Sequence, residues 1–159
     1  MKVIICENYD ELSQKAFEVM KEVVTSKENP VLGLATGSSP IGLYKCMIKD
    51  HQENGTDYSK VTTFNLDEYV GLERNHSQTY YTFMHENLFE GIEIPEENVH
   101  LPLGNGDLEQ NCADYEKAME IVNDYQVISA NETSTAGGTY VANTTDWTQG
   151  TLTFSGTGA

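Results

Sequence analysis

The sequence predicts an α/β fold with a mostly parallel sheet. Two observations predict it. Short apolar strand candidates alternate with helical stripes over the first 128 residues, and the segment VLGLAT (31–36) is apolar until its last residue, as in a strand buried on both faces. The 159 residues suit one domain with a substantial core. Ligands of such sheets bind beyond the carboxyl ends of the strands, so the turns that follow the strands are the first candidates for a site.

The spacing of the apolar residues predicts each element in order. Short β-branched or apolar runs bounded by turn residues predict strands over 2–8, 31–36, 61–70, 98–103 and 125–129. Apolar residues that recur every three or four positions predict helices over 9–26, 41–51, 77–89 and 108–123. Ser77 would cap the third of these helices.

The last 31 residues, 129–159, differ in composition from the α/β part, 1–128. They hold nine Thr, five Gly and only two charged side chains, Glu132 and Asp146. A polar β-hairpin over 139–155 is one reading, because apolar and polar residues alternate near its end. Disorder is the other, because so little apolar surface could offset the entropy of ordering.

The charge of the chain argues against several classes of partner. Its 25 Asp and Glu against nine Lys and Arg give a net charge of −16, which disfavours nucleic acids and anionic membranes because both need clustered cations. No segment approaches the roughly 18 apolar residues of a membrane span, and the first residues do not read as a secretory signal. Cys6, Cys46 and Cys112 are widely spaced, so we expect reduced thiols in a cytoplasmic protein.

We expect no metal ion in this protein. The four histidines, His51, His76, His85 and His100, are dispersed and form no HxxxH or HxH pair. His76 stands out among them because it precedes the helix that follows the acid-bearing loop described below.

A turn of small residues follows the strand at 31–36. Thr36, Gly37, Ser38 and Ser39 precede Pro40, which suits the first position of a helix. The unpaired N–H groups and the dipole of a helix N-terminus attract anions, and the hydroxyls add donors, so this GSS turn could hold a phosphate without nearby cations. A plain strand–turn–helix with a serine cap is the alternative. It is not a Walker loop, because no Gly-Lys-Ser/Thr follows.

Two adjacent acids, Asp67 and Glu68, end the strand VTTFNLDEYV. In an extended segment they point to opposite sides, so at most one of them faces a given pocket. A partly desolvated carboxylate at this edge of the sheet can act as a base near neutral pH. Asn65 could orient that carboxylate or bind a sugar hydroxyl, and we take Thr36, Asn65 and Glu68 as further candidates for substrate binding. The alternative is that the acids only solvate the strand end.

Four stretches, in order, resemble the glucosamine-6-phosphate deaminase family over about residues 1–128. They are VLGLATGSSPIGLYKCMI, KVTTFNLDEYVGL, HSQTYYTFMHENLF and ENVHLPLGNGD. The resemblance implies a partial Rossmann-like three-layer sheet, the N-terminal half of the family fold, followed by a Thr/Gly-rich tail.

The resemblance also implies a substrate and roles for site residues. The family converts glucosamine 6-phosphate to fructose 6-phosphate and ammonia in amino-sugar catabolism. Gly37, Ser38 and Ser39 would then hold the sugar phosphate, and Asp67 would move a proton between C1 and C2. Such an isomerisation needs a positioned base and no metal or organic cofactor.

The sequence departs from the family pattern after residue 128. There the family has a loop, GxxGHxxFNEP, that supplies the histidine for ring opening and its supporting acids. Here the approach NDYQVIS is followed by ANETSTAGGTYV, no histidine follows His100, and no Lys or Arg follows Lys117. Loss of positioned acid–base groups costs about 100- to 10,000-fold each, so activity of this chain alone is in question.

Three functions stay open at this point. The chain is a truncated deaminase, a non-catalytic fragment that binds a sugar phosphate, or an interaction module that uses its tail. Half a sheet leaves a parallel strand exposed. The alternation at 151–155 would let the tail pair with such an edge, and otherwise the edge predicts homo-oligomers.

Overall fold

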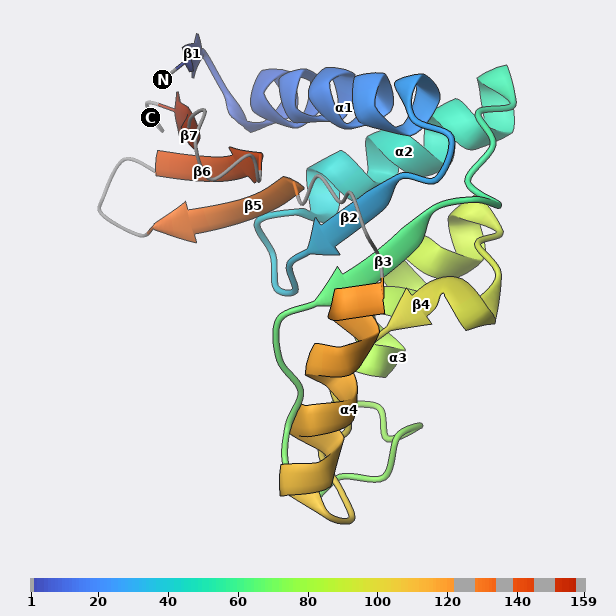
Figure 1. Ribbon diagram of the computed structural model, residues 1–159. Helices are drawn as coiled ribbons and strands as arrows, with labels where there is room; N and C mark the ends of the chain where they lie inside the picture. Colours follow the sequence, from blue (N-terminus) through green and yellow to red (C-terminus); the bar gives the residue numbers. More distant parts are fainter. Residues whose placement is uncertain (1, 122–127, 134–138, 145–150, 157–159) are drawn as a thin grey trace.

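The computed structural model describes residues 2–121, 128–133, 139–144 and 151–156 (Figure 1). In chain order its main elements are β1 (Lys2–Cys6), α1 (Tyr9–Ser26), β2 (Val31–Leu34), α2 (Ile41–Asn54), β3 (Thr62–Asn65), α3 (Tyr80–Met84), β4 (Val99–His100), α4 (Leu108–Ile121), β5 (Ile128–Thr133), β6 (Thr139–Thr144) and β7 (Thr151–Gly156). A π-helical turn continues α3 over His85–Phe89, and 3₁₀ turns span Glu90–Ile92 and Glu96–Asn98. Among the described helices, none combines the length and apolar character needed to cross a bilayer.

Strands β2, β3 and β4 form a parallel sheet in that order, as the α/β prediction requires. Leu34 at the end of β2 lies opposite Asn65 at the end of β3. Since parallel strands point the same way, the turn after β2 and the loop after β3 leave the sheet at one edge (Figure 1). This edge is where the sequence places its candidate site.

Helices lie on both faces of this sheet (Figure 1). On one face α1 packs against α2, and most of the buried core lies between these helices and the strands, including Met20, Leu32, Tyr44, Met47, Leu88 and Phe89. On the other face α4 brings Tyr115 edge-on to Phe64 of β3, with ring centroids 5.8 Å apart. Phe64 in turn stacks on His100 of β4 at 4.6 Å, and burial lowers the pKa of that histidine.

The helix starts show which sequence signals decide the local structure. Helix α1 begins at Tyr9 as predicted, because the Asn8 side chain accepts a hydrogen bond from the Glu11 N–H at 2.9 Å. The prediction that Ser77 caps the helix expected over 77–89 was wrong. Helix α3 begins at Tyr80, and Thr79 is its cap, accepting from the Thr82 N–H at 3.1 Å.

Some strands are shorter than their apolar runs. Strand β3 ends at Asn65, so Asp67 and Glu68 lie in the loop that follows it and not in the strand. Strand β4 has two residues, against six in the predicted segment 98–103. Of the strand predicted over 125–129, residues 125–127 lie outside the described part of the chain, and β5 begins at Ile128.

The tail contributes three strands that join β1 in a second sheet of order β1-β7-β6-β5. Strands β6 and β7 are antiparallel, with Thr139 opposite Ser155, which is the hairpin alternative for this segment. Strand β7 runs parallel to β1, with Ile4 opposite Phe154. The tail strands therefore pair with the first strand of the chain, while β5 lies beside β2 (Figure 1).

Candidate active site

The GSS turn connects β2 to α2 at the carboxyl edge of the sheet. Gly37 has a φ of 93°, a conformation that residues with a side chain rarely adopt, so glycine suits this position. The hydroxyl of Tyr44 anchors the start of the turn by donating to the Ala35 carbonyl at 2.5 Å, and burial raises the pKa of that hydroxyl. Helix α2 begins at Ile41 and receives no side-chain cap from Pro40. The Tyr44 hydrogen bond therefore holds the start of the turn, and the cap residue of the helix that follows contributes no side-chain cap.

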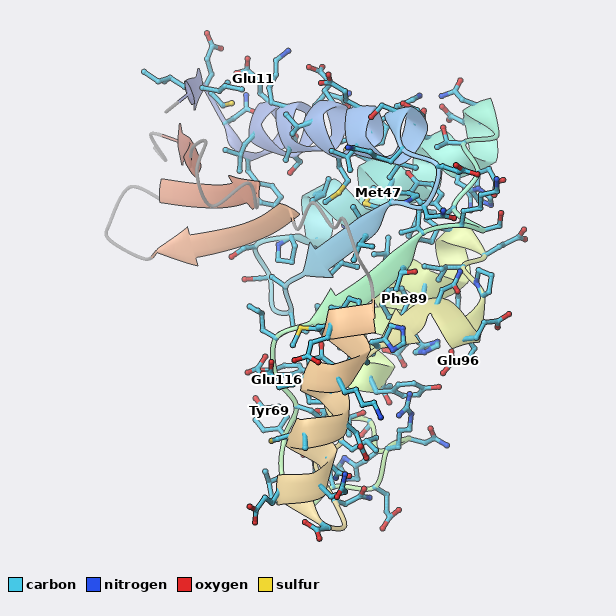
Figure 2. All side chains as sticks on the ribbon, viewed as in Figure 1. Glu11, Met47, Tyr69, Phe89, Glu96 and Glu116 are labelled. Carbon is cyan, nitrogen blue, oxygen red and sulfur yellow. The ribbon has the colours of Figure 1, made fainter. Side chains whose placement is uncertain are left out.

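The side chains of Thr36, Tyr69 and Tyr80 come from three separate segments and lie near this turn. The Tyr80 hydroxyl at the start of α3 lies 3.4 Å from the Tyr69 hydroxyl, and the Thr36 side chain and the Asp67 charge both influence its pKa. Figure 2 shows Tyr69 on the loop that follows β3. The hydrogen bond with Tyr69, burial and the nearby Asp67 charge raise the pKa of Tyr80, so its hydroxyl stays protonated at neutral pH. Tyr80 thus lies within electrostatic reach of both the GSS turn and the predicted base.

Asp67 itself is exposed on the loop after β3. The partial desolvation expected from its position at a strand end is therefore absent. Asp67, Asn65 and Glu68 are all among the residues that line one cleft. Both acids belong to the loop that follows β3, which ends at Asn65.

Asn65 joins the ends of the two central strands. Its side chain is buried, and Nδ2 donates to the Leu34 carbonyl of β2 at 2.9 Å. Its backbone carbonyl accepts a hydrogen bond from the Tyr115 hydroxyl of α4. The Oδ1 atom has no hydrogen-bond partner among the described residues, although Asn65 borders the cleft. The amide therefore fixes the edge of the sheet and keeps one acceptor unused.

Glu68 is committed to the protein backbone. Its Oε1 accepts from the N–H of Tyr69 at 2.8 Å and of Tyr80 at 2.9 Å, and its Oε2 accepts from the N–H of Tyr81 at 2.9 Å. Together with Thr79 it satisfies the N-terminal amides of α3, which would otherwise lack partners. Glu68 was a candidate for substrate binding, but in the structure both of its carboxylate oxygens bind backbone N–H groups.

Replacing Glu68 with Gln is expected to lower the free energy of unfolding by about 1–3 kcal/mol, because the amide offers one acceptor where the carboxylate offers two and loses the charge at the helix N-terminus. Urea unfolding of the wild type and the variant measures the difference. Glu73→Gln is the matched control, since Glu73 is an exposed acid on the same loop. Equal changes in the two variants would contradict the capping role.

The cleft beside Asp67 has a volume of about 490 Å³, within the range of about 300–1,000 Å³ that is typical of small-molecule sites. It lies between the loop after β3, the segment 102–104 and α4, and its walls also include Phe64, Val70, Leu108, Cys112 and Met119. The GSS turn does not line this cleft. Asp67, the predicted base, is among the residues that line it, whereas neither Thr36 nor Tyr80 is.

Gly104 holds two loops of the site together. Its carbonyl accepts from the Gly71 N–H at 2.8 Å, and a Cβ atom at position 104 would lie 1.9 Å from the Tyr69 carbonyl oxygen. Gly104→Ala is expected to destabilise the protein by about 1–3 kcal/mol, because rigid backbone has to move to relieve the overlap. Thermal unfolding measures this, with Asn105→Ala as the exposed control. A variant as stable as the control would show that the two loops can separate freely.

The histidines do not converge on this site. His76 is exposed, and its Nδ1 accepts from the Gln78 N–H at 3.2 Å. His85 packs against Tyr81 and Phe89 on the side of α3, 3.3 Å from the carboxylate of Glu96. Among the described residues, no three His, Cys, Asp or Glu side chains gather as metal ligands would.

Sequence reasoning did not single out Tyr69 or Tyr80. Both belong to stretches that carry the family resemblance, but an aromatic residue near the start of a helix is explained equally well as part of the hydrophobic core. Only the folded chain brings the two hydroxyls together across 11 positions.

Comparisons with known proteins match this chain over most of its length. A sequence model described as glucosamine-6-phosphate isomerases/6-phosphogluconolactonase matches residues 7–133. Glucosamine-6-phosphate deaminase of Thermoanaerobacter sp. (strain X514) is 51% identical over 121 residues, which are 76% of this chain and 48% of that protein. Glucosamine-6-phosphate deaminase 2 of Bacillus subtilis (strain 168) is 50% identical over 117 residues, which are 73% of this chain and 47% of that protein. The chain therefore spans about half the length of the curated relatives it matches.

Solved structures give the same result for the fold. A monomeric glucosamine-6-phosphate deaminase superposes with a TM-score of 0.75 at 38% identity, covering 78% of this chain and 52% of that chain. A 6-phosphogluconolactonase from Thermotoga maritima has a TM-score of 0.64 at 19% identity, covering 79% and 57%, and shows the fold alone. The sequence match over residues 7–133 and these relatives show that the chain belongs to the glucosamine-6-phosphate isomerase/6-phosphogluconolactonase family.

Proposed function

We propose that this chain binds glucosamine 6-phosphate with its phosphate at the GSS turn and that Asp67 is the base of a deaminase-type isomerisation. The observation that carries the proposal is the parallel register of β2 and β3, because of which the GSS turn and the loop of Asp67 both leave the sheet at one edge. Thr36 of the turn segment and Asp67 both influence the pKa of Tyr80, which supports their proximity. The relatives named glucosamine-6-phosphate deaminase support this choice of substrate.

The chemistry asks little of the protein beyond positioning. In the open-chain amino sugar, the Asp67 carboxylate takes the proton from C2 and delivers it to C1, while the C1 oxygen gains a proton and the C2 nitrogen loses one, so the C1 aldehyde becomes an alcohol and C2 becomes an imine. Water then adds to C2, and ammonia leaves to give fructose 6-phosphate. Proton transfer by one positioned carboxylate contributes about 100- to 10,000-fold to such a rate.

Binding without turnover is the second candidate, and one observation favours it. The sequence contains no FNEP and no histidine after His100, where the family pattern has its ring-opening histidine and supporting acids. A chain that keeps the turn and the base but lacks these groups would hold the sugar phosphate without releasing ammonia.

One experiment separates the two candidates. Ammonia release from glucosamine 6-phosphate is measured in the same samples as thermal stabilisation by that sugar, with unphosphorylated glucosamine as the matched ligand. Turnover supports the deaminase proposal, and stabilisation by the phosphorylated sugar without turnover supports the binding fragment. The absence of both turnover and stabilisation would overturn both candidates, because a ligand at 100 times its dissociation constant stabilises a protein by about 2.7 kcal/mol, which the thermal measurement would detect.

We infer a reducing, cytoplasmic location for this activity. Cys6, Cys46 and Cys112 are free thiols, and Cys6 is buried. Burial raises the pKa of Cys6 above its ordinary value, so this thiol is protonated and unreactive near neutral pH. Growth on glucosamine as nitrogen source, followed by cell fractionation, tests the location directly.

A further inference from the structure

Tyr9 reaches the GSS turn from the first residue of α1. Its hydroxyl lies 2.9 Å from the Ser39 carbonyl oxygen and 3.2 Å from the Ser38 carbonyl oxygen, and it accepts a hydrogen bond from the Gly42 N–H at 2.7 Å. One hydroxyl group therefore ties together three backbone groups about 30 positions away along the chain. None of the roles assigned to the turn above uses this contact.

The sequence around the turn is shaped to admit the Tyr9 ring. A Cβ atom at Gly42 would lie 2.0 Å from the Ser13 Oγ and 2.8 Å from the Tyr9 ring, so a side chain at position 42 would push α1 away from α2. Pro40 supplies neither a side-chain cap nor a backbone N–H. The Tyr9 hydroxyl thus satisfies an N-terminal amide of α2 that the helix's own cap residue leaves open.

The hydrogen bonds of the Tyr9 hydroxyl fix which way the peptide groups of the GSS turn point. The carbonyl of Ser38 and the N–H of Ser39 belong to one planar trans peptide and point in opposite directions. Since Tyr9 holds the Ser38 carbonyl toward α1, the Ser39 N–H is held away from α1. The hydroxyl also takes the Gly42 amide for itself, so an anion at this turn meets amides of the turn and not that of Gly42.

We propose that Tyr9 is a positioning residue that holds the GSS turn in the shape that receives the phosphate. This inference rests on the proposed function, since it assigns Tyr9 a part in the same site. A turn held in its binding shape before the ligand arrives avoids the ordering cost that a mobile turn would pay on binding. The role is assigned to the hydroxyl, because it is the hydroxyl that bonds the backbone of the turn and of Gly42.

The test compares wild type with Tyr9→Phe, which keeps the ring and removes the hydroxyl. Backbone amide shifts are followed by NMR while glucosamine 6-phosphate and, separately, inorganic phosphate are added. The dissociation constants of both are expected to rise about 5- to 10-fold, because a turn that Tyr9 no longer holds must be ordered on binding. Hydrogen exchange at the Gly42 amide is expected to become faster in the same variant, and binding of unphosphorylated glucosamine is expected to stay unchanged.

Tyr81→Phe is the matched control. Its hydroxyl donates to Glu96 at 3.0 Å, so this variant also loses one tyrosine hydrogen bond, but away from the turn. Its affinity for the phosphates should equal that of the wild type. If Tyr9→Phe binds as tightly as the control while Gly42 exchanges faster, Tyr9 only joins two helices and the inference fails alone. If the wild type binds neither phosphate, the proposed function fails, and the inference falls with it.

Discussion

The Asp67→Asn variant is expected to lose proton transfer by a factor of about 100 to 10,000 while still binding the sugar phosphate, because the amide cannot accept the proton that a carboxylate accepts. Asp67 is exposed and borders the cleft, so the substitution removes a charge without leaving a buried group unpaired. Binding should survive because the proposed phosphate contacts come from the GSS turn and not from the Asp67 side chain.

The sharpest measurement uses a partial reaction. In deuterium oxide, a base positioned over C1 exchanges a C1 proton of fructose 6-phosphate for deuterium, and NMR follows the loss of that signal. This exchange requires the bound ketose and the base but neither ammonia nor a complete catalytic loop. It therefore tests Asp67 even if the chain never completes a turnover.

The matched control is Glu86→Gln, which neutralises an exposed acid beyond the start of α3 and should exchange at the wild-type rate. Exchange that persists in Asp67→Asn would assign the base to another residue. Exchange that is absent from the wild type, together with clear binding, would establish this chain as a binding fragment.

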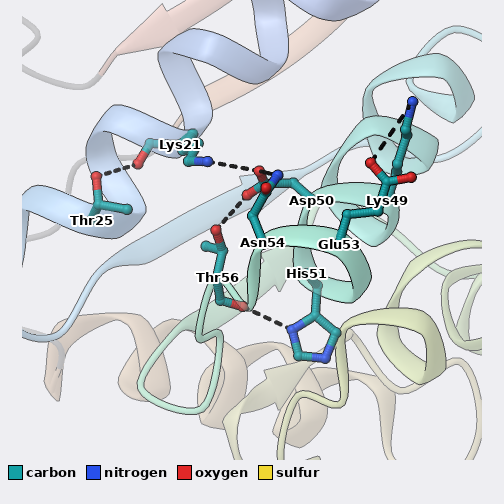
Figure 3. Close-up of polar contacts among 8 residues, drawn as sticks. All are labelled: Lys21, Thr25, Lys49, Asp50, His51, Glu53, Asn54 and Thr56. Atoms are coloured by element: carbon teal, nitrogen blue, oxygen red, sulfur yellow. Dashed lines mark hydrogen bonds and ion pairs between the residues drawn. The ribbon is translucent and has the colours of Figure 1, made fainter.

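The Asp50→Ala variant is expected to show the largest loss of stability among the substitutions considered. Asp50 of α2 is 5% exposed, and its carboxylate accepts from Lys21 Nζ at 2.7 Å, from Asn54 Nδ2 at 2.8 Å and from the Thr56 hydroxyl (Figure 3). These bonds tie α1, α2 and the segment that leads into β3. We expect a loss of about 2–4 kcal/mol in the free energy of unfolding, below the upper values for buried pairs because Lys21 can return to water.

The same carboxylate makes stability depend on pH. Burial by itself raises the pKa of Asp50, but the hydrogen bonds from Lys21, Thr56 and Asn54 outweigh it, so the pKa in the folded protein lies below its ordinary value. A depressed carboxyl pKa stabilises the folded state above the unfolded pKa of about 4, and this stabilisation is lost as the pH falls through the folded pKa.

Urea unfolding between pH 3 and pH 7 tests this dependence, since the stabilisation begins to fall as the pH drops toward the unfolded pKa of about 4. The wild type should lose stability more steeply on acidification than Asp50→Asn, which keeps the shape of the side chain but cannot ionise. Parallel profiles for the two proteins would show that Asp50 does not carry the acid sensitivity.

Periodicity alone predicted the parts of the fold in which local and tertiary preferences agree. The helix from Tyr9 to Ser26 has a capping residue, Asn8, and a continuous apolar stripe, and the structure places both ends as predicted. The parallel sheet follows from short apolar strands separated by helices, and it brings the GSS turn and the loop of Asp67 to one edge. The position of the candidate site could therefore be predicted from the sequence.

Contacts between distant segments could not be predicted in the same way. Ser77 and Thr79 both carry a hydroxyl that can cap a helix, and nothing local distinguishes them. Glu68 binds amides 12 and 13 positions away, and only the folded loop brings them within reach. The same holds for Tyr9 and Gly42, whose contact depends on how α1 crosses α2.

Because Glu68 binds the amides at the start of α3, the N-termini of α2 and α3 differ in charge. The positive end of a helix dipole attracts any nearby anion, and two helices, α2 and α3, begin beside the loop of Asp67. The charge of Glu68 offsets that attraction at α3, while no charged side chain of its own caps α2. With the phosphate site proposed above, this difference would draw a monophosphate toward α2 and not toward α3, and would favour one orientation of the sugar over its reverse.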